Sequence, residues 1–125
     1  MQDLDQTTWG AKLSEDSNAI ILDVRAPWEY EEGNIPGARN IDVQDAAGFM
    51  DAVGKLDASK NYYVYCRSGG RSARACMIMN SVGVPNTFNL IGGITEWQGA
   101  VTTNWRHHEK TSIDLVCNRY AIYRL

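Results

Sequence analysis

Residues 64–72 of the chain read Val64-Tyr65-Cys66-Arg67-Ser68-Gly69-Gly70-Arg71-Ser72. This pattern predicts a strand that ends at a cysteine, then a short glycine-bearing turn, then the start of a helix. A thiol at such a junction lies where backbone N–H groups converge and where the helix dipole favours negative charge. Both effects lower the pKa of a thiol, and the thiolate is its reactive form. We therefore expect Cys66 to be a nucleophile rather than an inert buried cysteine.

The same turn carries two arginines, Arg67 and Arg71. An arginine is most often a solvated surface cation, but two of them beside a thiolate favour the binding of an oxyanion. The adjacent glycines let the backbone curl so that several N–H groups face inward and form a nest for an anion. The predicted anion-binding residues are Arg67, Ser68, Gly69, Gly70, Arg71 and Ser72.

Outward from this turn, apolar segments alternate with helical patterns. Apolar and β-branched runs predict strands at 19–24, 40–43, 62–65 and 87–91. Caps and helical spacing predict helices from Thr7 or Thr8 to about Ser14, from Asp45 to about Leu56, from Ser72 to Val82, and after Gly92-Gly93. The third helix should turn Ala75, Cys76, Met79 and Val82 toward the core. This alternation predicts an α/β fold with a parallel sheet, whose functional loops lie at the carboxyl ends of the strands.

Composition excludes several classes of function. The chain has 125 residues, which suits one domain, and its 12 basic and 15 acidic residues leave a net charge of −3. Without a basic run, we expect no nucleic-acid partner. No apolar run has the length of a membrane helix, and the polar, acidic N-terminus argues against a secretory signal. Three cysteines without C-x-x-C spacing favour neither a disulfide framework nor a zinc site, and they point to a reducing cytoplasm.

Three ordered motifs resemble the signatures of the rhodanese family, and specifically of its single-domain sulfurtransferases. They are Leu22-Asp23-Val24-Arg25 with Glu29-Tyr30 and Gly33-x-Ile35-Pro36-Gly37-Ala38-x-Asn40, then Tyr65 to Ser72, then Gly92-Gly93-Ile94-x-Glu96-Trp97. Asn34 stands where the family often has histidine. The resemblance covers residues 4–100 and implies a rhodanese-like three-layer α/β/α domain with a central, mostly parallel sheet. Residues 101–125 then form a C-terminal tail of unknown structure.

The resemblance also implies sulfur transfer through a persulfide on Cys66. The thiolate takes the sulfane sulfur of a small anionic donor such as thiosulfate and passes it to cyanide, to a thiol or to a protein acceptor. Covalent catalysis in two steps predicts ping-pong kinetics. The reaction needs no cofactor, no metal and no histidine base if the turn already lowers the thiol pKa.

Asp23 and Arg25 lie at the end of the first buried strand. We expect them to support the site through an ion pair or loop hydrogen bonds rather than to take part in the chemistry. Trp97 is expected in the core or the pocket wall. Trp28 and Tyr30 either line the mouth of the site or pack on the surface.

Two other functions fit parts of the pattern. A cysteine-dependent phosphatase or arsenate reductase of related fold also places its cysteine in a backbone nest. Four residues separate Cys66 from Arg71, however, and the phosphatase loop is one residue longer, so this turn suits a sulfur atom better than a phosphate. The second alternative is a non-catalytic or redox-sensing rhodanese-like binding module. Cys76 lies about 15 Å along the helix from Cys66, too far to resolve its oxidised form.

The tail gives weaker signals. His107-His108 and the distant Cys117 lack the paired spacing of metal ligands, so a metal site is not expected. Residues 113–123 fit both a helical stripe and a strand-like alternation. The segment is an added element, an interaction arm or sequence foreign to the domain.

Overall fold

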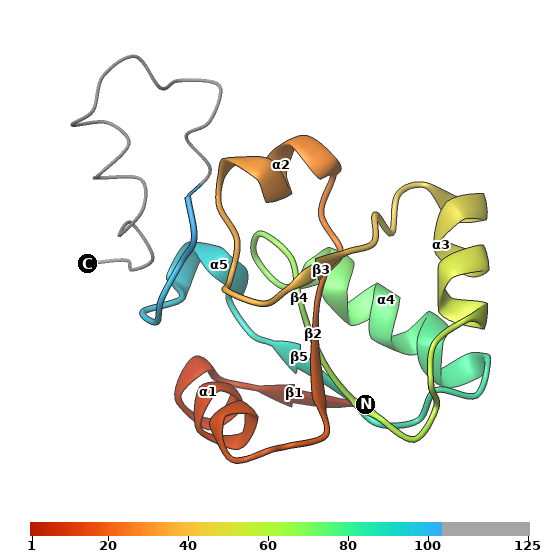
Figure 1. Cartoon of the computed structure of the whole chain (residues 1–125), viewed down its shortest axis with the longest axis horizontal. Coiled ribbons are helices and arrows are strands. Elements are labelled where there is room, and N and C mark those ends of the chain that lie inside the picture. Colours follow the sequence, from red (N-terminus) through yellow and green to blue (C-terminus); the bar gives the residue numbers. More distant parts are fainter. Residues whose placement is uncertain (104–125) are drawn as a thin grey trace.

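The computed structural model describes residues 1–103, and one five-stranded sheet lies at the centre of this part of the chain (Figure 1). The strand order is β1-β5-β4-β2-β3, and every pairing is parallel, which confirms the predicted α/β class. The strands are β1 (Gln2–Leu4), β2 (Ala19–Asp23), β3 (Arg39–Asn40), β4 (Asn61–Tyr65) and β5 (Thr87–Leu90).

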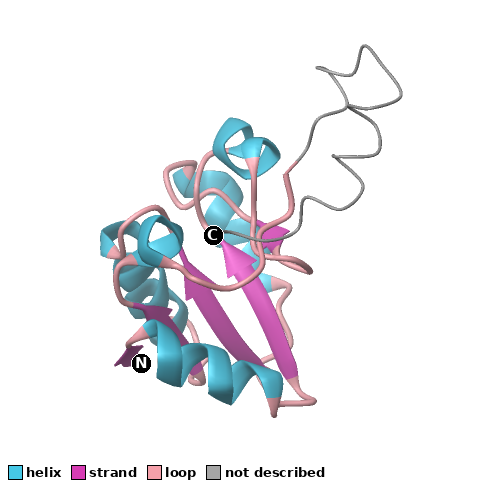
Figure 2. Ribbon diagram, turned by 90° about the vertical axis from the view of Figure 1, so that its left-hand side faces the viewer, coloured by secondary structure: helices cyan, strands magenta, loops and turns pink. Residues whose placement is uncertain are grey.

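Helices cover both faces of this sheet and give the three layers seen in Figures 1 and 2. The helices α1 (Gln6–Ser14) and α5 (Gly93–Glu96) lie on one face, and α3 (Ala46–Gly54) and α4 (Gly70–Ser81) lie on the other. A further short helix, α2 (Pro27–Glu32), lies beyond the carboxyl end of β2. Parallel strands require such crossovers, which place the β–α loops together at one edge of the sheet.

The central strand β4 feeds both layers of the core. Tyr62 and Val64 pack toward α3 and α4, whereas Tyr63 and Tyr65 pack toward α1 and α5, as the two-residue period of a strand requires. The side chains of both faces are therefore buried, which explains why the strand is apolar and aromatic without alternation.

Trp9 and Trp97 anchor the layer on the α1 side. Trp9 is fully buried and meets the Trp97 ring edge to face at 5.3 Å between centroids. Trp97 thus lies in the core, one of the two positions expected for it. Val101, at the start of the predicted tail, packs in the same cluster, and the neighbouring Thr102 bridges to Asn34.

Helix ends differ from the sequence prediction in ways that have local causes. The N-cap of α1 is Asp5 and not a threonine, because the Asp5 carboxylate accepts the Thr8 N–H at 2.8 Å. The helix α4 begins at Gly70, two residues before the predicted start. Val82 follows its end and is 45% exposed, so the expectation that Val82 faces the core was wrong. Gly83, at φ +97°, ends the last turn of this helix.

No helix among residues 1–103 has the length and apolar character needed to cross a lipid bilayer.

Candidate active site

Cys66 directly follows β4 at the carboxyl edge of the sheet and opens the turn that leads into α4. Gly69 caps α4 with φ +111°, a backbone conformation that favours glycine. This conformation bends the turn back over the sulfur, so that the Gly69 N–H donates to Cys66 Sγ at 3.1 Å. The turn therefore wraps around the thiol, and Cys66 as a whole is only 1% exposed.

The hydrogen bonds to Cys66 Sγ favour its ionised form. Burial is the largest influence and by itself would raise the thiol pKa. The backbone N–H groups of Ser72, Gly69 and Ser68 act in the opposite direction, and so does the Ser72 hydroxyl, 3.3 Å away, whenever its proton points at the sulfur. Together they hold the Cys66 pKa below its ordinary value.

The six predicted anion-binding residues divide by exposure. Arg67, Ser68 and Gly70 are exposed at the surface of the turn. Ser72 is fully buried under the sulfur. The turn thus has a buried side that contacts the thiol and an open side that faces solvent.

Arg71 and Arg67 have different surroundings. Both terminal guanidinium nitrogens of Arg71 donate to the Glu29 carboxylate, at 2.8 and 3.0 Å. This pairing raises the pKa of Arg71 and lowers that of Glu29. Among the described residues no carboxylate pairs with Arg67. Sequence reasoning missed Glu29 as the partner of Arg71, because a bond between residues 42 positions apart leaves no local signal.

Asp23 and Arg25 form a buried ion pair with a 2.7 Å contact, the arrangement expected from the sequence. The Tyr65 hydroxyl donates to the same carboxylate at 2.8 Å, and Arg25 also donates to the Gly33 carbonyl at 2.6 Å. Burial opposes the charge of Arg25, but the hydrogen bond and the charge of Asp23 raise its pKa. The pair connects the end of β2 with the loop after α2.

The N-terminus of α5 holds the turn from the other side. Ile94 N–H donates to the Cys66 carbonyl at 3.0 Å, and Thr95 N–H donates to the Arg67 carbonyl at 3.1 Å. Gly93, at φ +60°, allows this approach, since a Cβ there would lie 2.6 Å from the Cys66 carbonyl oxygen. Sequence reasoning placed Gly92-Gly93 before a helix and within the third motif but did not predict this contact; the glycine doublet was the available signal for a close backbone approach.

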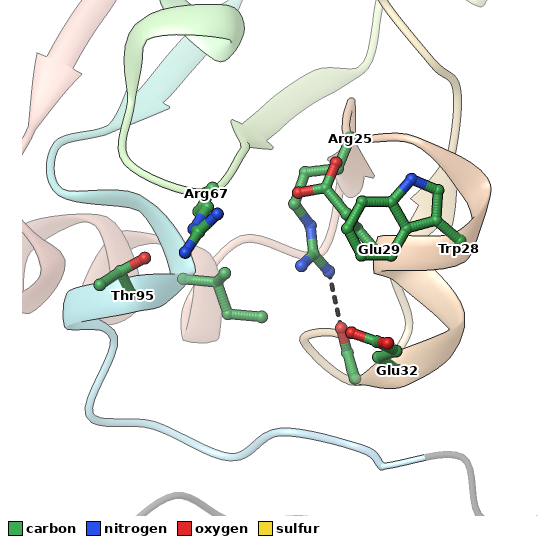
Figure 3. Close-up of a pocket in the computed structure, with 8 residues that line it drawn as sticks. Arg25, Trp28, Glu29, Glu32, Arg67 and Thr95 are labelled. Carbon is green, nitrogen blue, oxygen red and sulfur yellow. Dashed lines mark hydrogen bonds between the residues drawn. The ribbon is translucent and has the colours of Figure 1, made fainter.

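A cleft of about 500 Å³ opens beside the turn. Figure 3 shows Arg67 and Thr95 on one side and Arg25, Trp28, Glu29 and Glu32 on the other. Trp28 is 64% exposed and belongs to the mouth of the cleft, one of the two positions expected for it. The exposed cation Arg67 therefore faces a wall that contains an aromatic ring, two carboxylates and the ion-paired Arg25.

Within residues 1–103 no group of three or more histidine, cysteine, aspartate or glutamate side chains is placed to hold a metal ion. His107, His108 and Cys117 lie outside the described residues.

Comparisons with known proteins agree with this architecture. Residues 6–100 match the sequence profile of the rhodanese-like domain. The putative sulfurtransferase YtwF of Bacillus subtilis is 36% identical over 88 residues, covering 70% of this chain and 82% of that protein. A sulfurtransferase of Allochromatium vinosum is 29% identical over 97 residues, covering 78% and 88%.

The crystal structure of a rhodanese-like domain protein from Staphylococcus aureus superposes with a TM-score of 0.68 at 28% identity. It aligns with 78% of this chain and 91% of its own. The fold, the cysteine turn that follows β4 and the match over residues 6–100 lead to one conclusion: the chain belongs to the rhodanese-like domain family.

Proposed function

We propose that this protein is a rhodanese-type sulfurtransferase that carries sulfane sulfur as a persulfide on Cys66. The observation that carries this proposal is the Cys66 sulfur itself, which accepts the Gly69 N–H at 3.1 Å and has a lowered pKa. A thiolate is required both to attack a donor and to leave when the sulfur is passed on. The sulfurtransferase names of relatives about 30% identical support the same chemistry.

In the first step the Cys66 thiolate attacks the outer sulfur of thiosulfate. A new S–S bond forms to Cys66, the S–S bond of the donor breaks, and its electron pair leaves with sulfite. In the second step a thiophile such as cyanide attacks the outer sulfur, thiocyanate leaves, and the thiolate returns. The N–H groups around Cys66 would stabilise the negative charge in both states.

The charges of the turn fit a small anionic donor. Arg67 is the exposed guanidinium and would bind the sulfonate end of thiosulfate. Arg71 contributes a positive charge that Glu29 already balances, so its role is to shape the turn as well as to attract an anion. Because Cys66 is only 1% exposed, the site suits compact donors better than bulky ones.

Cys66 and Cys76 are both free thiols, which suits work in a reducing compartment such as the cytoplasm. The acceptor is a thiol, cyanide or the thiol of a protein. The proposed reaction requires no resident cofactor.

A donor screen read out by mass spectrometry tests this proposal. The full chain is incubated with thiosulfate, its intact mass is measured, and thiocyanate is assayed after cyanide is added. We expect one added sulfur on Cys66 and its release as thiocyanate; Cys66→Ser should abolish both, while Cys76→Ser and Cys117→Ser retain them. Absence of both the adduct and thiocyanate would falsify the thiosulfate version.

Two results would favour the other functions instead. Hydrolysis of an aryl phosphate that depends on Cys66 would indicate a phosphatase. Partner capture that is unchanged by Cys66→Ser, together with no sulfur loading from any donor, would indicate a binding module.

A further inference from the structure

The Ser72 hydroxyl has one proton but three acceptors within reach. It lies 3.3 Å from Cys66 Sγ and 3.2 Å from the Gly69 carbonyl oxygen, and it makes a short hydrogen bond to Asn89 Oδ1. Ser72 is fully buried and Asn89 is 3% exposed, so water does not supply further partners freely. The orientation of this single proton therefore decides whether the sulfur faces the O–H donor or the lone pairs of the Ser72 oxygen.

The direction of these bonds follows from the charge of Asp3. A carboxylate only accepts hydrogen bonds, so the Asn89 Nδ2 group must point at Asp3, to which it donates at 2.8 Å. Asn89 Oδ1 then faces Ser72, and an amide oxygen also only accepts. The Ser72 hydroxyl consequently donates to Asn89 in the resting arrangement.

This direction turns the lone pairs of the Ser72 oxygen toward Cys66. They suit the S–H of a neutral thiol, which can donate to them, and they oppose a thiolate. For Ser72 to stabilise the thiolate, its hydroxyl must rotate to the sulfur and leave the buried Asn89 oxygen without a donor. Leaving a buried acceptor without a donor costs free energy, so the hydrogen-bond network makes ionisation of Cys66 less favourable.

We propose that Asn89, oriented by Asp3, is a positioning residue that withholds the Ser72 proton from Cys66 and keeps the thiol protonated to higher pH than the turn alone would. This inference rests on the proposed function only in taking Cys66 as the reactive group. A higher pKa preserves the nucleophilicity of the Cys66 thiolate, because nucleophilicity falls as the pKa of a thiol falls. The turn activates the sulfur, and Asn89 limits that activation.

Other charged and titratable groups also surround the sulfur. Arg71 on α4 interacts with it electrostatically, as does Cys76 on the same helix. Asp3 on β1 lies behind Asn89, and Asp23 on β2 acts on Arg71. All of them remain in an Asn89 variant, so a change in that variant reports the hydrogen-bond network.

The test is the pH dependence of Cys66 alkylation by iodoacetamide in the full chain. Trypsin separates the three cysteines into different peptides, because Lys60 and Arg67 bracket Cys66 while Arg106 and Lys110 lie between Cys76 and Cys117. The Cys66 peptide therefore reports its own rate by mass spectrometry. Alkylation needs no sulfur donor, so its result stands even if thiosulfate loading fails.

Asn89→Leu removes the acceptor and keeps the branch of the side chain at Cγ, and the freed hydroxyl can donate to the thiolate. We expect the midpoint of the alkylation profile to fall by about one pH unit. The Gly69 carbonyl remains a competing acceptor, but an ionised sulfur attracts the proton more strongly than a neutral carbonyl. The rate at full ionisation should fall by about two- to threefold.

The Ser72→Ala background decides between the network and a packing effect. There Asn89→Leu should leave the midpoint unchanged, because no hydroxyl remains to redirect. A shift of equal size in both backgrounds, an upward shift, or no shift in either would overturn the proposal.

Asp3→Asn is the second variant if Asn89→Leu does not fold. It permits the Asn89 amide to turn its Nδ2 group toward Ser72, and it also removes a negative charge, so the midpoint should fall. Only the charge effect should survive in the Ser72→Ala background. A midpoint shift of equal size in both backgrounds would assign the whole effect to charge and contradict the proposed orientation by Asp3.

Discussion

The Glu29 carboxylate on α2 holds the Arg71 guanidinium on α4 through two hydrogen bonds, at 2.8 and 3.0 Å. The side chains are 11% and 22% exposed, so solvent screens the pair only weakly. The bond ties the active-site turn to the helix that borders the cleft. It also means that the charge of Arg71 cannot be considered apart from that of Glu29.

Arg71→Ala should raise the KM for thiosulfate more than the loss of one cation alone explains. The Glu29 carboxylate is then left without its partner beside the site, where it repels the donor. We expect a rise of roughly tenfold to a hundredfold. The double variant Arg71→Ala with Glu29→Gln should recover part of it, since it removes the unpaired charge. Steady-state kinetics of both variants provide the check, and equal KM values would contradict the coupling.

Gly93→Ala should destabilise the domain and impair the turn. Its Cβ would lie 2.6 Å from the Cys66 carbonyl oxygen, and the backbone stands at φ +60°. We expect a loss of about 2 kcal/mol or more in the free energy of unfolding, with lower activity. The matched control is Gly54→Ala, where a Cβ meets nothing within 4 Å. Urea unfolding should show the control unchanged or up to about 1 kcal/mol more stable.

Tyr65→Phe should lower the free energy of unfolding by about 1–3 kcal/mol. The Tyr65 hydroxyl accepts the Ile35 N–H at 3.0 Å and donates to Asp23 at 2.8 Å, and its removal leaves a buried N–H unsatisfied. Tyr62→Phe is the control on the same strand. The Tyr62 hydroxyl donates to the carbonyl of the exposed Asp57, which water can reach. A loss for Tyr62→Phe as large as that for Tyr65→Phe would contradict this account.

Stability at alkaline pH should depend on Cys76. Burial raises the pKa of the Cys76 thiol to about 11, whereas an unfolded cysteine ionises near pH ~8.5. The folded state therefore keeps a proton that the unfolded state loses. The contribution is complete below pH ~8.5 and disappears as the pH rises toward 11.

The comparison with Cys76→Ala isolates this effect, since the other groups that titrate are shared by both proteins. The difference in unfolding free energy between the natural chain and the variant should shrink by about 3 kcal/mol across that range. Urea titrations at neutral pH and near pH ~10 should already show about 2 kcal/mol of this loss. An undiminished difference at the higher pH would show that the thiol is not held neutral.

Much of the site could be predicted because its parts are local in sequence. Cys66 and Ser72 belong to one continuous turn, so the strand, the glycines and the helix start indicated a thiol in an anion nest. Asp23 and Arg25 are likewise two residues apart, which made their ion pair predictable. Such short-range geometry depends on φ, ψ and hydrogen bonds that the neighbouring residues decide.

Other elements left weak local signals. The strand β1 (Gln2–Leu4) is short, polar and largely exposed, and it exists because it pairs with β5. The helix α2 was not among the predicted helices, because Pro27 and Gly33 commonly interrupt regular structure, yet Pro27 starts this helix and Gly33 caps its end. The strand β1 therefore depends on a tertiary contact, and the helix α2 depends on the residues at its two ends. The secondary-structure preferences of the residues inside these segments did not decide either element.

By itself the sequence determined the layered α/β fold, the place of Cys66 at the end of a central strand and the turn that lowers its pKa. These follow from periodicity and from bonds between near neighbours. Only the tertiary structure decided that Arg71 is paired with Glu29, that α5 clamps the turn, and that Asn89 and Asp3 control the Ser72 proton. These contacts join residues 17 to 86 positions apart. No local pattern encodes such a pairing, because it arises only when packing of the sheet brings separate strands and helices to one edge.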